Sequence, residues 1–83
     1  MPPSPSASAA QNSLRASAFA RELVALAPYR ERGHALLMEI LTARGNGAEA
    51  LHVYEHVRQL LRDDLGAAPG PELRELQERL LRR

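Results

Sequence analysis

The sequence predicts an all-α fold of about four helices, in which a central helical hairpin is flanked by further helices. From residue 16 onward, apolar residues recur at intervals of three and four, which is the period of a helix face. Glycines and prolines interrupt this pattern where helices would end or begin. No segment alternates apolar and polar residues as a half-buried strand would. With 83 residues, the chain forms at most one domain.

The start of the chain predicts a disordered tail over residues 1–11, followed by the domain over residues 12–83. The sequence after Met1, PPSPSASAA, has three prolines, three serines and no charge. Such a segment buries too little apolar surface to offset the entropy lost on ordering. Asn12 or Ser13 can then cap the first helix, because their side chains accept backbone hydrogen bonds. Its predicted inward face consists of Ala16, Phe19, Ala20, Leu23 and Leu26.

The next two predicted helices form the hairpin, over residues 28–44 and 47–65. Pro28 cannot continue the first helix but suits the first position of the second. Gly45 is expected in the left-handed region at the end of this second helix. Asn46 followed by Glu49 resembles a capping box that starts the third helix. The apolar residues expected at the hairpin core are Leu37, Leu41, Ala50, Tyr54 and Val57.

The fourth helix is expected over residues 71–82, after a rigid turn. Gly66 ends the third helix, and Ala-Ala-Pro-Gly-Pro follows it. Pro71 suits the first position of a helix. Glu72 near the start and Arg79 near the end both favour the helix dipole.

Composition and charge exclude several classes of function. Eleven arginines and ten acidic residues give a formal net charge of +1, which provides no long-range attraction for nucleic acid. The chain has no cysteine, which excludes disulfides and thiolate metal sites, and no apolar run long enough to cross a membrane. We therefore expect a cytoplasmic protein that binds neither nucleic acid nor membrane directly and carries no cofactor.

One motif points to catalysis. His52, Glu55 and His56 spell H-x-x-E-H, the pattern of a class of zinc proteases, in which two histidines bind the metal and the glutamate polarises its water. A zinc-dependent hydrolase is therefore an alternative. We favour a non-catalytic reading, because such a site needs a third ligand and a dry cavity, and only 27 residues follow His56. His34 is interpreted as a hydrogen-bonded packing residue.

The hairpin resembles a tetratricopeptide (TPR) repeat, which is a helix–turn–helix unit of about 34 residues. Ala50 and Tyr54 form the A-x-x-x-Y step of its second helix, where a small residue lets the helices approach and the ring fills the gap beyond. His34 and Met38 depart from the pattern, which usually has a large aromatic and a small residue there. The resemblance implies a fragment of a right-handed α-α superhelix.

A second resemblance covers residues 20–82 and is to the bacterial transcriptional activator domain of the actinobacterial antibiotic-regulatory (SARP-type) regulators. Three blocks carry it: RERGHALLM, AEALHVYEHVRQLL and LRDDLGAAPGPELRELQERL. The last is the most specific, since it combines a helix end, a proline–glycine–proline turn and a helix start. Members of that family typically begin with a winged helix-turn-helix, which this chain lacks, and carry earlier helices of the domain. Gly33 replaces a large apolar residue.

The resemblance implies a protein-protein interaction module of a transcriptional regulator without its own DNA-binding domain, here only the C-terminal part of the activator domain. An inactive truncated fragment of such a regulator is a further alternative. RNA polymerase, a DNA-binding regulator or a second copy of the chain is the expected partner. The interaction surface is predicted at leucines that lack cover once the earlier helices are missing: Leu36, Leu51 and Leu60.

Overall fold

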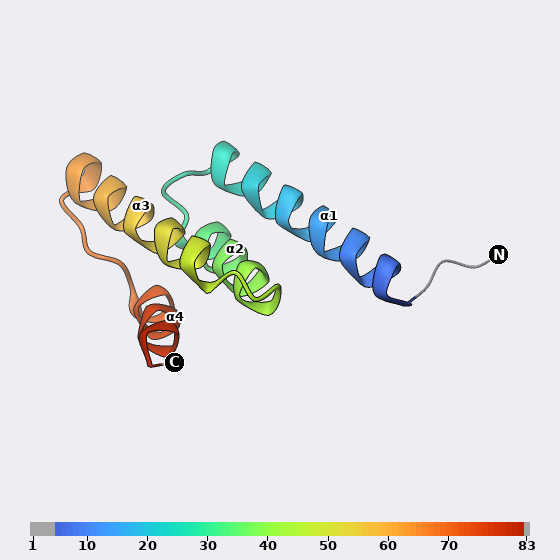
Figure 1. Cartoon of the computed structure of the whole chain (residues 1–83). Helices are drawn as coiled ribbons and strands as arrows, with labels where there is room; N and C mark the ends of the chain where they lie inside the picture. Colours follow the sequence, from blue (N-terminus) through green and yellow to red (C-terminus); the bar gives the residue numbers. More distant parts are fainter. Residues whose placement is uncertain (1–4, 83) are drawn as a thin grey trace.

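A computed structural model describes residues 5–82 and contains four helices (Figure 1). They are α1 (Pro5–Leu26), α2 (Glu31–Ala43), α3 (Gly47–Leu65) and α4 (Pro71–Leu81). The prediction of an all-α, TPR-like fold is confirmed, because the described residues form only helices and the turns between them. None of the helices in this part of the chain is long and apolar enough to cross a membrane.

Helix α2 occupies the centre of the fold. It packs against each of the other three helices, and α3 also packs against α4. Successive helices in the series α1, α2 and α3 run antiparallel, so that α1 and α3 point the same way on two sides of α2 (Figure 1). Within the described chain, no Cα atom of α1 lies within 8 Å of a Cα atom of α3 or α4. The handedness of a longer superhelix stays a prediction.

The core lies mainly between α2 and α3. The five residues expected at the hairpin centre are all buried there: Leu37, Leu41, Ala50, Tyr54 and Val57. Met38 is fully buried as well, although the repeat pattern usually has a small residue at this position. Met38 belongs to the buried core cluster, where a flexible methionine side chain can fill irregular space.

The two ends of the hairpin follow the predicted glycines. Gly45 has a φ of 78° and Gly66 a φ of 63°, so both lie in the left-handed region that glycine tolerates. At the end of α2, the Gly45 N–H donates to the Thr42 carbonyl (3.0 Å) and the Asn46 N–H to the Leu41 carbonyl (2.8 Å). This pair of bonds is a Schellman motif, which satisfies carbonyls that the helix leaves free.

Asn46 caps α3 as predicted, but the capping box is closed differently. The Asn46 side chain accepts a bond from the Glu49 N–H (3.4 Å). The Glu49 carboxylate in turn accepts from the Asn46 side-chain amide (2.5 Å) instead of the Asn46 backbone N–H. The reason is the Schellman motif, which already uses that backbone N–H at the end of α2.

The start of α1 differs from the prediction. The helix begins at Pro5, not near Asn12, so residues 5–11 of the expected disordered tail are helical. Residues 1–4 of that tail lie outside the described residues. The helix extends because proline is tolerated at a first helical position and the alanines that follow are strong helix formers. Serine alone does not stop a helix.

The inward face of α1 also differs. Ala20 is buried as predicted, but Phe19 and Leu26, also predicted to face inward, are 58% and 78% exposed, and Ser17 is buried instead. Small residues are buried at this interface because α1 lies close to α2. A Cβ added at Gly33 of α2 would be 3.6 Å from side-chain atoms of Leu23 and Val24 of α1. The face of α1 with the largest side chains therefore points away from the core.

Helix α2 begins at Glu31, three residues later than predicted. Residues 27–30 form a turn closed by the Arg30 N–H and the Ala27 carbonyl (3.1 Å), with Pro28 inside it. The Pro28 carbonyl oxygen, which lies in this turn, is 2.8 Å from Nε2 of the His34 ring and is hydrogen-bonded to it. Proline's fixed φ suits such a turn as well as it suits a helix start.

Helix α4 is attached by apolar and polar contacts. Leu73 is fully buried and Leu76 nearly so. The Gly70 N–H, just before α4, donates to a carboxylate oxygen of Glu31 on α2 (2.5 Å). Arg32 and Glu72 form an ion pair beside it. The sequence pattern did not predict this polar link, because its partners lie 39 and 40 residues apart.

Candidate interaction site

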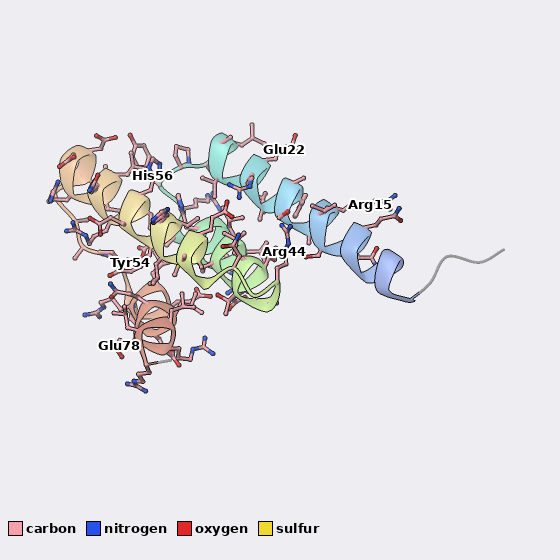
Figure 2. The ribbon with its side chains drawn as sticks, in the orientation of Figure 1. Arg15, Glu22, Arg44, Tyr54, His56 and Glu78 are labelled. Carbon is pink, nitrogen blue, oxygen red and sulfur yellow. The ribbon has the colours of Figure 1, made fainter. Side chains whose placement is uncertain are left out.

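A groove of about 470 Å³ lies between α1 and α3, whose backbones do not touch, over α2. Its apolar part is formed by Val24 and Ala25 of α1, Leu37 of α2 and Val53 of α3. Its polar part consists of Arg21, His34, Glu49, His52 and His56. Figure 2 shows His56 on the edge of α3 that is nearest to α1. An apolar floor with a polar rim is the usual anatomy of a protein-binding surface.

Two side-chain bridges link α1 and the turn after it to α3. Arg21 forms an ion pair with Glu49 at the start of α3 (Nη2–Oε1, 2.6 Å). The Tyr29 hydroxyl donates to Asp64 near the end of α3 (2.8 Å), and this bond raises the pKa of Tyr29. Both bridges are exposed, so each adds little to stability. Along α3, they flank the groove residues His52 and His56.

His34 is 1% exposed and lines the groove from α2. Burial lowers its pKa, which keeps the ring neutral near pH 7. Its Nε2–H donates to the Pro28 carbonyl (2.8 Å), which leaves Nδ1 as an acceptor. The interpretation of His34 as a hydrogen-bonded packing residue is confirmed by this bond. Within the described chain, Nδ1 has no hydrogen-bond partner.

The H-x-x-E-H residues lie on the outer part of α3. His52, Glu55 and His56 are all exposed. The Glu55 carboxylate accepts two bonds from Arg58 (2.8 and 2.5 Å) and one from Gln59 (3.1 Å), which lower its pKa to about 2. A carboxylate this acidic is a poor general base at neutral pH. Among residues 5–82, no three His, Cys, Asp or Glu side chains are grouped to hold a metal ion.

The three leucines predicted as the interaction surface are not brought together. Leu36 packs against the core from α2. Leu51 and Leu60 are half-buried, and their nine-residue separation places them roughly 180° apart around α3. The leucines therefore form no single patch, and their role in binding stays a prediction.

The groove was missed because it uses apolar residues that were assigned to no predicted helix face. Val24 directly follows Leu23 and Val53 directly precedes Tyr54, and Leu23 and Tyr54 were assigned to buried faces. Both valines are partly buried against the core. Such unassigned apolar residues were the signal available in the sequence. Helical periodicity alone does not show that α1 and α3 are separated over α2 and leave a groove between them.

Comparison with known proteins decides the family. The sequence model of the family described as "Bacterial transcriptional activator domain" matches residues 7–81. The chain belongs to this family. The family assignment made from the three sequence blocks is thus confirmed, and the match begins within α1, five residues before the expected domain start.

Several relatives of this activator domain are named as regulators. The chain is 53% identical over 60 residues to the regulatory protein AfsR of Streptomyces griseus, which covers 72% of the chain and 6% of that protein. It is 45% identical over 71 residues to the transcriptional regulatory protein EmbR of Mycobacterium tuberculosis, which covers 82% of the chain and 18% of that protein. The chain thus spans a small part of the length of these relatives. No solved structure matches it.

Proposed function

We propose that this activator domain is a non-catalytic protein-interaction module of a cytoplasmic transcriptional regulator. The observation that carries the proposal is the family match over residues 7–81. The names of the relatives, a regulatory protein and a transcriptional regulatory protein, support the regulatory context. The inactive fragment and the zinc hydrolase are the competing hypotheses.

The groove between α1 and α3 is the proposed binding site. Its floor and walls offer aliphatic side chains to an incoming apolar residue, and its rim offers the charged Arg21 and Glu49 and the exposed His52 and His56 to polar groups of a partner. We propose RNA polymerase or a DNA-binding regulator as the protein that fills this groove.

The distribution of charge favours a protein over nucleic acid. Two arginines on the exposed face of α3 are engaged by acidic neighbours: Arg58 pairs with Glu55 and Arg62 with Asp63. An arginine that already has a carboxylate partner releases few counterions on meeting a phosphate. The net charge of +1 adds no wider attraction.

Binding to purified RNA polymerase tests the proposal. Val53→Arg fills the groove from α3 and adds a charge to its apolar wall, while the matched control Ala48→Arg adds the same charge at an exposed position of the same helix. We expect the full chain to bind polymerase holoenzyme in biolayer interferometry. We expect Val53→Arg to weaken this binding more than tenfold and Ala48→Arg to leave it unchanged. Circular dichroism verifies that both variants are folded.

The same assay with a DNA-binding family regulator covers the second partner, and a random DNA duplex serves as the nucleic-acid arm. Absence of binding to both proteins would contradict the proposal, and so would equal losses for the two variants. Salt-sensitive binding to the duplex of similar strength would replace it with a nucleic-acid function.

A further inference from the structure

Helix α1 carries an apolar stripe that the described chain covers only in part: Ala16 and Leu23 are half-buried, whereas Phe19 and Leu26 are exposed. The stripe consists of Ala16, Phe19, Leu23 and Leu26, which follow one another at intervals of three, four and three residues. This is the a/d spacing of a coiled-coil seam. Phe19 and Leu26 are among the most exposed large apolar residues of the protein. The α1 stripe therefore has the form of a contact surface for another helix.

The α1 stripe is separate from the proposed binding groove. Arg21 lines the groove and lies two residues, roughly 200° of helix rotation, from Phe19. A helix that packs on the stripe would thus approach α1 from the side opposite the groove. The two surfaces can be tested independently.

One edge of the stripe carries complementary charges. Arg15 and Glu22 are seven residues apart and occupy the g positions of the two heptads defined by the a/d residues. Figure 2 shows both side chains on the outer side of α1, away from α3 and α4. Neither side chain takes part in an ion pair within residues 5–82, whereas the neighbouring Arg21 is paired with Glu49. These two charges are therefore free to meet a partner.

The charges specify the partner and its direction. When a second copy of the same helix packs antiparallel, the same edge of the seam meets itself, so Arg15 of each copy lies beside Glu22 of the other. A parallel pair would bring Arg15 and Glu22 against the opposite edge, where Ala20 and Ala27 offer no charge. Ala20 is moreover buried against the body of its own chain. Only the antiparallel arrangement of two copies uses both charges.

The same register sets which residues meet across the seam. With Arg15 beside Glu22 of the second copy, Phe19 lies beside Ala16 of the second copy, so a large side chain faces a small one, and Leu23 lies beside the exposed Asn12. Sliding the helices by one heptad would place Phe19 beside Leu23 but would also bring the two Glu22 side chains together, which is unfavourable. The charges thus select one register.

From these observations we propose that two copies of the chain associate through antiparallel α1 helices, with Phe19, Leu23 and Leu26 in the seam and an Arg15–Glu22 pair at each end of a twofold axis. Each contact occurs twice, as in any interface that pairs one surface with itself. The interface is exposed at its edge, so its charged pairs are sensitive to salt.

Sedimentation equilibrium of the full chain tests this inference with a charge-swap series. Arg15→Glu and Glu22→Arg each turn two attractions into two repulsions, and we expect each to weaken the dimer roughly tenfold. The double variant exchanges the charges and should restore wild-type affinity. Arg74→Glu, an exposed change of the same charge on α4, should leave the affinity unchanged. Phe19→Glu should abolish the dimer while the circular dichroism stays that of the folded chain.

Each other outcome overturns the proposal. A wild-type chain that stays monomeric at all concentrations would show that the stripe serves some other protein segment. A dimer that is insensitive to Phe19→Glu would place the interface elsewhere. A dimer weakened by each single charge reversal but not restored by the double variant would exclude the antiparallel register.

Discussion

Glu31 should hold α4 against α2 through its bond to the Gly70 N–H, and Glu31→Gln tests how much this bond contributes. The substitution keeps the size of the side chain and one oxygen acceptor, but removes the charge. A hydrogen bond to a charged group contributes about 1.5–3 kcal/mol, and one between neutral groups about 0.5–1.5 kcal/mol. We therefore expect Glu31→Gln to lower the free energy of unfolding by about 1 kcal/mol. Glu31→Ala, which leaves the N–H without its protein partner, should cost about 1.5–3 kcal/mol.

Urea denaturation followed by circular dichroism measures both losses. For a domain of this length, 1 kcal/mol corresponds to a shift of about 4–8 °C in Tm, so thermal melting is a second measure. Glu39→Gln is the matched control, because Glu39 is exposed on the same helix. Hydrogen exchange of the Gly70 amide gives a local readout, since loss of its acceptor should accelerate exchange there. Equal stabilities for Glu31→Gln and Glu39→Gln, with unchanged exchange at Gly70, would refute the reasoning.

Three further predictions concern the core and the response to pH. Tyr54→Ala should leave a cavity between α3 and its neighbours and lower the free energy of unfolding by about 3–5 kcal/mol. Ala50→Leu should overpack the hairpin and lower it by about 1–3 kcal/mol. Urea denaturation measures both losses, and wild-type midpoints for both variants would contradict this packing. Burial lowers the pKa of His34 below its ordinary 6.5, so stability present above pH 6.5 should be lost as pH falls through the lower pKa of the folded state. His34→Gln, which can still donate to Pro28, should flatten this part of a stability–pH curve. Arg58 lowers the pKa of Glu55 from 4.5 to about 2, so the free energy of unfolding should decrease as the pH falls from 4.5 to about 2. Glu55→Gln should remove this decrease. The same slope of stability against pH in the wild type and the variant would refute the role of the ion pair.

The sequence was most informative where a residue has one conformational use. Gly45 and Gly66 marked helix ends because a left-handed residue is nearly always glycine, and Asn46 marked a helix start because its side chain replaces a missing backbone partner. Pro28 was less informative, since its fixed φ suits a turn and a helix start equally. Serines in α1 gave no reliable boundary, because serine is also found inside helices.

Which face of a helix turns inward was harder to predict than the helix itself. Hydrophobicity favoured Phe19, Ala20 and Leu26 for the buried face of α1; Ala20 is buried, but Phe19 and Leu26 are exposed and Ser17 is buried in their place. The choice depends on the distance between two helices, which no periodicity contains. The candidate groove was missed for a related reason, because its walls come from α1 and α3, which are separated in the sequence by the whole of α2.

The central position of α2 has a consequence for how the protein comes apart. Because α1 and α4 touch α2 but not each other, the loss of one removes no direct contact of the other. The molecule should therefore open from its two edges independently, as a short stack of units does when only neighbours interact. Amide protons of α2 and α3 should exchange last, and a protein that captures α1 could act on an intact hairpin whether or not α4 is docked.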